Sequence, residues 1–109
     1  MKFYKGIVPE KMDWRVRIIE DANPVRMSSL PLRLDVMKHS PSGFSWGYPG
    51  SGPAQLALAI LCDAIGVERA RPLYQQFKAQ KIATLRQDAS WTMSLDDVLE
   101  WVAEHETVQ

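Results

Sequence analysis

The first third of the chain alternates apolar and polar positions with a period of two, which is the pattern of half-buried β-strands. Residues 3–8 form one strand candidate and residues 14–19 form a second. A third candidate covers residues 30–34, where Pro31 would confine the strand to a sheet edge. We therefore expect a small N-terminal antiparallel sheet of two to four strands, with a turn at residues 21–24.

Residues 53–65 are almost continuously apolar. A helix that is apolar on most of its sides is a buried one, so this segment is predicted to be the central helix of the fold. Ser51 or Gly52 is the expected N-cap, and Pro53 suits the first helical position because its missing N–H group has no intrahelical partner there. Gly66 is the expected left-handed residue that ends the helix.

Two further helices are predicted in the second half of the chain. One covers about residues 68–85, provided that Pro72 lies in its first turn. The other begins after Ser94 as N-cap, with Trp101 at the edge of its buried face. That face follows the i, i+3, i+4, i+7 spacing and comprises Leu95, Val98, Leu99 and Val102.

These patterns predict an α+β fold in which the N-terminal sheet packs against about three helices, with helix 53–65 central. A chain of 109 residues suits one domain. We expect a strand-rich part at residues 1–38, an ordered loop at 39–52 and a helical part at 53–105.

The loop at residues 39–52, which we call the aromatic loop, combines Ser, Gly and Pro with three alternating aromatic residues. Phe44, Trp46 and Tyr48 lie close to His39 in the sequence, and such rings can stack on the bases of single-stranded nucleic acid. Packing of the rings beneath the loop is the simpler interpretation. These four residues are therefore candidates for ligand or partner binding.

The end of the aromatic loop opens directly into the predicted central helix. Free N–H groups at such a junction can bind a phosphate or carboxylate, which makes Gly50, Ser51, Gly52 and Gln55 further binding candidates. The segment matches neither the Walker A loop nor the GxGxxG dinucleotide motif, and Pro53 removes one donor. A tight turn that leads into a buried helix is the simpler interpretation.

The formal net charge is zero, from 13 Lys and Arg and 13 Asp and Glu, but the charges are distributed unevenly. Residues 1–86 carry 13 basic and seven acidic residues, hence 13 − 7 = +6, and residues 87–109 carry six acidic residues and neither Lys nor Arg, hence −6. Either the acidic helix packs beside a basic body, or two faces serve an anionic and a cationic partner. The acidic partner face would comprise Asp96, Asp97, Glu100 and Glu104.

No motif for catalysis or metal binding is present. His39 and a nearby loop serine resemble a nucleophile and base, but the GxSxG motif is missing. The single cysteine, Cys62, offers neither a disulfide nor a zinc pair. We expect no catalytic residue, cofactor or metal. The N-terminal residues do not resemble a secretory signal and no apolar run is long enough for a bilayer, so we expect a cytoplasmic protein without membrane association.

The strings HSPSGFSWGY at residues 39–48 and GSGPAQLALA at residues 50–59 are similar to the core of the domain of unknown function 6166 family, whose members are small bacterial and phage proteins. The resemblance extends to LYQQFK at 73–78 and, more loosely, to WTMS at 91–94. It implies no established activity, but it does imply a phage or mobile-element setting. Small domains in that setting often bind a host protein, nucleic acid or signalling nucleotide.

Three functions follow as hypotheses. The first is a non-enzymatic binding module, such as a phage accessory or anti-defence protein that blocks a host or defence-system protein or a nucleoprotein assembly. The second is a protein that binds a nucleotide or cyclic dinucleotide at the glycine-rich helix start. The third is a small hydrolase centred on His39 and a loop serine, which has the least support.

Overall fold

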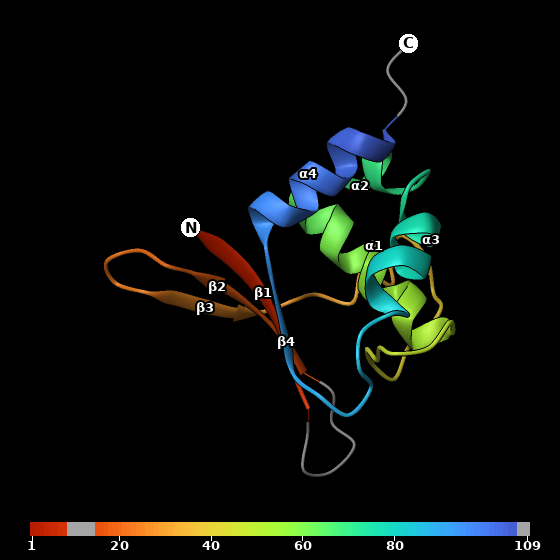
Figure 1. Ribbon diagram of the computed structural model, residues 1–109, viewed down its shortest axis with the longest axis horizontal. Helices are drawn as coiled ribbons and strands as arrows, with labels where there is room; N and C mark the ends of the chain where they lie inside the picture. Colours follow the sequence, from red (N-terminus) through yellow and green to blue (C-terminus); the bar gives the residue numbers. More distant parts are fainter. Residues whose placement is uncertain (9–14, 107–109) are drawn as a thin grey trace.

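A four-stranded antiparallel sheet forms one layer of the protein, and the helices lie on one side of it (Figure 1). The computed structural model describes residues 1–8 and 15–106. The strands are β1 (Lys2–Ile7), β2 (Arg15–Glu20), β3 (Arg26–Ser29) and β4 (Trp91–Ser94), in the order β3-β2-β1-β4. The predicted α+β fold with an N-terminal sheet is thereby confirmed.

The sheet has a buried inner face and a solvent-facing outer face, because successive strand residues point to opposite sides. Tyr4 on β1, Val16 and Ile18 on β2, and Trp91 on β4 are buried toward the helices. The hydroxyl of Tyr4 donates a hydrogen bond to Asp63 at 2.7 Å and so joins the sheet to the central helix. Burial, reinforced by the Asp63 carboxylate, raises the pKa of Tyr4.

The predicted third strand is wrong in position. The strand covers Arg26–Ser29, and the chain leaves the sheet after Leu30, whose N–H still donates to the Val16 carbonyl at 3.0 Å. Pro31 has no N–H for the ladder, and Arg33 then adopts a positive φ of 60°, which turns the chain away. The fourth strand, β4, was not predicted as a strand, because four residues next to a helix give too short an alternation.

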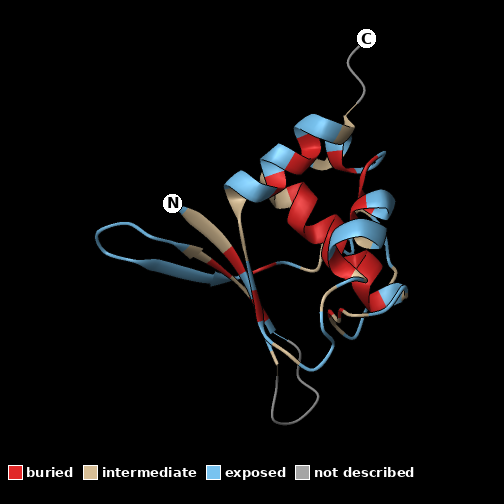
Figure 2. Cartoon of the chain, in the orientation of Figure 1, coloured by how far each residue is buried: buried red, intermediate tan, exposed pale blue. Residues whose placement is uncertain are grey.

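The central helix is α1 (Ser51–Ile65), and residues 52–62 within it are all buried. Figure 2 shows this buried stretch running through the helical layer. The N-cap is Gly50 rather than Ser51 or Gly52, so Pro53 occupies the third helical position instead of the first. A proline is tolerated there because N–H groups of the first turn have no intrahelical acceptor. Gly66 ends the helix with a positive φ of 87°, but its ψ of 164° lies outside the left-handed helical region that was predicted.

The continuous helix predicted over residues 68–85 is instead three short pieces: α2 (Val67–Ala70), α3 (Tyr74–Phe77) and the π-helical turn η1 (Lys78–Ile82). Turn residues that include Pro72 separate α2 from α3. The proline ring and its missing N–H disrupt a helix that already has a preceding turn, so Pro72 does not fit inside one continuous helix.

The last helix, α4 (Leu95–His105), begins as predicted with Ser94 as N-cap, whose hydroxyl accepts the Asp97 N–H at 3.0 Å. Its buried face differs from the prediction. Trp101 is buried together with Val98 and Val102, whereas Leu99 is 39% exposed. No helix in the described ranges is long and apolar enough to cross a bilayer.

Candidate functional site

A groove of about 500 Å³ lies between η1 and α4, next to β4. It is lined by Phe77, Gln80, Lys81, Thr84, Leu85, Thr92, Met93, Asp97, Glu100, Trp101 and Glu104. Apolar residues form its base, and charged and polar side chains stand on the two helical walls. We call this hollow the η1–α4 groove.

Trp101 fixes the base of the groove. Its ring contacts Phe77 edge-on, with ring centroids 4.9 Å apart, and its indole N–H donates to Gln80 Oε1 at 2.9 Å. On the other side it stacks on His105 at 4.1 Å, while the Nδ1–H of His105 donates to the Trp101 carbonyl at 2.8 Å. The contacts with Phe77 and Gln80 join α4 to the segment formed by α3 and η1.

The α4 wall carries Asp97, Glu100 and Glu104, which share one helix face because they are three and four residues apart. All three side chains are exposed. Within residues 1–8 and 15–106, no Lys, Arg or His side chain forms an ion pair with any of them. The structure thus brings three residues of the predicted acidic face to the groove, whereas Asp96 is exposed but does not line it.

The opposite wall is formed by the π-helical turn. The N–H of Ala83 donates to the carbonyl of Lys78 at 2.8 Å, a bond that spans five residues and widens the helix locally. Lys81 and Thr84 face the groove from this wall. Turns of this kind occur frequently at functional sites. This wall could not be predicted from the sequence, because an i→i+5 bond has no recognisable residue pattern.

A signal for the base of the groove was nevertheless present in the sequence. Val98, Trp101, Val102 and His105 also follow the i, i+3, i+4, i+7 spacing. This register buries a tryptophan instead of Leu99, and the larger apolar surface of tryptophan favours it.

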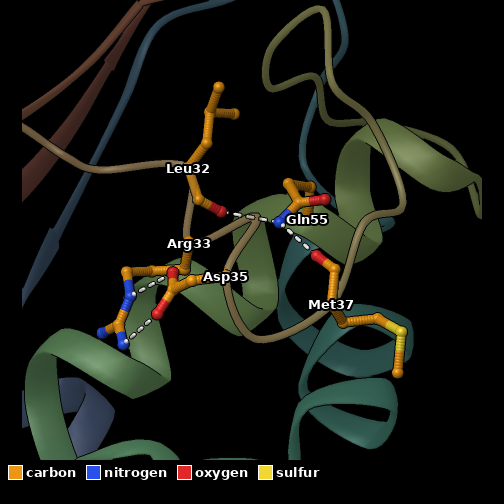
Figure 3. Close-up of polar contacts among 5 residues, drawn as sticks. All are labelled: Leu32, Arg33, Asp35, Met37 and Gln55. Carbon is orange, nitrogen blue, oxygen red and sulfur yellow. Dashed lines mark hydrogen bonds and ion pairs between the residues drawn. The ribbon is translucent and has the colours of Figure 1, made fainter.

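Gln55 on α1, by contrast, uses its polar groups inside the protein and ties the start of the aromatic loop to the helix. Gln55, with no exposed surface, accepts the N–H groups of His39 and Ser40 at 2.8 and 2.9 Å. Its amide nitrogen donates to the carbonyls of Leu32 and Met37 at 2.6 and 3.0 Å (Figure 3). An amide has two donor hydrogens and two acceptor lone pairs, so all four positions are used. Gln55 therefore holds the segment of residues 32–40 against α1.

The glycines at the start of α1 are sites of close packing. A side chain on Gly52 would overlap Ser45 Oγ, and one on Gly50 would overlap the Tyr48 ring. The Ser45 and Tyr48 hydroxyls are themselves hydrogen-bonded at 2.7 Å. Tyr48 is 39% exposed, and Ser51 is exposed at the first turn of the helix. The absence of Cβ atoms thus lets the loop lie directly against the helix.

The other two aromatic residues of the loop point into the core. Trp46 has no exposed surface, contacts Trp91 edge-on with centroids 5.6 Å apart, and donates its indole N–H to the Ala89 carbonyl at 3.2 Å. Phe44 is 8% exposed. The alternate spacing of these two rings therefore reflects packing beneath the loop.

His39, the candidate base, has a structural partner, and Cys62, the single cysteine, is buried. His39 Nε2 lies 2.8 Å from the Tyr74 hydroxyl rather than next to a loop serine. Burial raises the pKa of the Cys62 thiol, which disfavours the reactive thiolate. Among the residues whose positions are described, no group of three or more His, Cys, Asp or Glu side chains is arranged to hold a metal ion.

Comparison with known proteins gives one match. The model of a family of unknown function, DUF6166, matches residues 8–104. No curated protein and no solved structure matches the chain.

Proposed function

Since the chain belongs to this family of unknown function, we propose a function from its geometry: a non-enzymatic binding module whose η1–α4 groove takes a basic segment of a partner protein. The observation that carries this proposal is the set of three exposed carboxylates that face a groove without ion-pair partners in the described ranges. Charges left free at a concave surface favour an oppositely charged ligand.

The size and lining of the groove support a peptide side chain as the ligand. Its volume of about 500 Å³ lies within the range of known ligand sites, roughly 300–1,000 Å³. Lys and Arg side chains combine an apolar stem with a cationic end. The stem would contact the apolar base beside Trp101 and Met93, and the cation would lie near Glu100 and Glu104.

The lining also supports binding rather than catalysis. None of the described residues that line the groove is a Ser, Cys or His, so the groove presents no nucleophile paired with an imidazole base. The carboxylates all stand on the same face of one helix. Two carboxylates that act as acid and base in glycoside hydrolysis flank the substrate from opposite sides instead.

The nucleotide hypothesis receives no comparable support at the start of α1. Gln55 already makes four hydrogen bonds, and Trp46 is buried. Ser51 and Tyr48 are the exposed ones among the predicted binding residues of the helix start and the rings, and Gly50 is half-buried. We therefore centre the proposal on the groove.

The groove proposal is tested with a fluorescent peptide of alternating Arg and Ala, measured by anisotropy at low salt. Substitution of Asp97→Asn, Glu100→Gln and Glu104→Gln together should weaken binding roughly tenfold or more, because it removes the attracting charges while preserving shape. The matched control is Glu20→Gln with Asp21→Asn and Glu68→Gln, three exposed acids outside the groove. Equal losses in the two triple variants would refute a groove-specific site.

The biological setting stays a prediction: a phage or mobile-element protein that binds and blocks a host or defence-system protein. Capture from bacterial lysate by the wild-type chain and by the groove triple variant, followed by mass spectrometry, identifies such a partner by its loss in the variant. Partners captured equally by both proteins do not use the groove.

A further inference from the structure

The outer face of the sheet is a second charged surface, opposite in sign to the groove. It is formed by the strand residues that alternate with the buried ones and so point away from the helices. The residues that define it here are Phe3, Lys5, Arg15, Arg17, Ile19 and Met27. No Asp or Glu stands at an outward position of the described strands.

The strand register orders these residues into two rows. Phe3 pairs with Ile19, and Ile19 pairs with Met27, so an apolar row crosses three strands. Lys5 pairs with Arg17 in the adjacent row, where Arg17 donates to Ser29 Oγ at 3.4 Å. An aromatic ring and an aliphatic strip therefore lie directly beside two cations on an open surface.

The pairing of Lys5 with Arg17 is unfavourable for the isolated sheet. Like charges directly opposite one another on antiparallel strands repel, because their side chains are neighbours on one face. No outward carboxylate of the described strands offsets this repulsion. An anion that bridges the two side chains would remove the repulsion, so the arrangement favours an anionic partner.

We propose that the outer face binds single-stranded nucleic acid, with Lys5 and Arg17 at the phosphates and Phe3 against a base. A single strand offers a regular series of phosphates beside unpaired bases, and a base has an aromatic face whatever its sequence. The cationic row would contact the phosphates, and the apolar row beside it would contact the bases. A duplex would present phosphates to the cations but would keep its base faces stacked away from Phe3.

This surface meets the groove at the β4 edge, where Thr92 pairs with Lys5 and also lines the groove, so the chain would hold a nucleic acid and a basic protein segment on neighbouring surfaces. The distribution of charge agrees with that arrangement. Lys5 and Arg17 lie on the sheet face turned away from the helices, whereas Glu100 and Glu104 line the groove between η1 and α4.

The test is anisotropy of a labelled oligothymidine of roughly 20 nucleotides at several salt concentrations. Substitution of Lys5→Glu with Arg17→Glu should weaken binding roughly thirtyfold or more and flatten the salt dependence, since phosphate contacts release counterions. The matched control, Arg71→Glu with Arg86→Glu, changes the net charge equally at two exposed positions off the sheet. It should weaken binding less than roughly threefold, because long-range attraction alone is screened.

A second variant, Phe3→Leu, separates stacking from charge. It keeps an apolar side chain but removes the ring, so binding should weaken roughly fivefold or more while the salt dependence stays unchanged. Thermal unfolding of each variant checks the fold, and Lys5→Gln with Arg17→Gln replaces the charge reversal if that variant fails to fold. The groove triple variant should bind the oligonucleotide like the wild type.

Three results would overturn the proposal. The first is a failure of charge-dependent binding. Either the wild-type chain does not bind oligothymidine at low salt, or the variant Lys5→Glu with Arg17→Glu loses no more affinity than its matched control. The second is equal affinity for duplex DNA of the same length. The third is binding to polyglutamate as tight as to oligothymidine and independent of Phe3, which would assign the face to an acidic protein instead.

Discussion

The aromatic loop and helix α4 differ in how they use their polar groups. The loop has the more unusual sequence, yet its Trp46 side chain and its His39 N–H group form hydrogen bonds inside the protein, the latter to Gln55 of α1. The helix reads as an ordinary amphipathic segment, yet Glu100 and Glu104 face a groove without ion pairs in the described structure. Close packing alone can require a distinctive sequence, so unused polar groups at a concave surface are the better guide to binding.

The largest expected effect is the loss of the Gln55 side chain. Gln55→Leu should lower the free energy of unfolding by about 3–5 kcal/mol, because it removes a fully buried amide that makes four hydrogen bonds and leaves two partly buried N–H groups and two carbonyls without these partners. Urea denaturation measures the loss. Gln76→Leu, at an exposed position, is the control and should change stability by about 0.5 kcal/mol or less. Similar results for the two variants would contradict the structural role of Gln55.

The next effect concerns the contact between the loop and α1. Gly52→Ala should destabilise the fold by about 2–3 kcal/mol, because the new methyl group overlaps Ser45 Oγ, although helix propensity alone favours alanine by about 1 kcal/mol. Thermal unfolding of the double variant with Ser45→Ala should show partial recovery. Gly43→Ala meets no neighbouring atom and should cost only about 1 kcal/mol for its positive φ. A neutral Gly52→Ala would show that the loop does not pack tightly.

The smallest expected effect concerns the carboxylates of helix α4. Glu100→Gln with Glu104→Gln should leave stability unchanged or raise it by up to about 0.5 kcal/mol, since it removes repulsion between like charges four residues apart. Denaturation at pH 7 and pH 4 provides the measurement. A loss above about 1 kcal/mol would mean that these carboxylates serve the fold rather than a partner.

Glu106→Gln is the matched control in the same helix region. Hydrogen bonds from Arg69 at 2.8 and 2.9 Å lower the pKa of Glu106. A lowered pKa in the folded state means that the stabilising contribution is present above the ordinary value of about 4.3 and is lost as the pH falls below it. The control should therefore be less stable than the wild type at pH 7, with the difference shrinking toward acidic pH.

Elements with strong local signals could be predicted from the sequence. The continuous apolar run indicated α1, and Ser94, as the N-cap residue, indicated the start of α4. The split of residues 68–85 could not be placed, because it depends on how the chain packs after Pro72. The strand after the turn at 21–24 was placed too late, since Leu30 and the residues beyond it keep the alternation although the chain has left the sheet.

The candidate site was predictable only on one side. The acidic residues of α4 were identified by charge, and the structure places Asp97, Glu100 and Glu104 at the groove. The facing wall depends on the π-helical turn, whose i→i+5 bond follows no residue pattern, and on the bond between Trp101 and Gln80, which are 21 residues apart. Neither periodicity nor composition reports such contacts.

The strand order β3-β2-β1-β4 also has a consequence for how the chain acquires its structure during synthesis. β1, β2 and β3 are close in the sequence and can pair early, but the partner on the other edge of β1 is made only when residues 91–94 are translated. Until then the open edge of β1 is a template for pairing with other chains. Addition of β4 closes that edge and is followed at once by α4, so the sheet and the groove are completed together by the same segment.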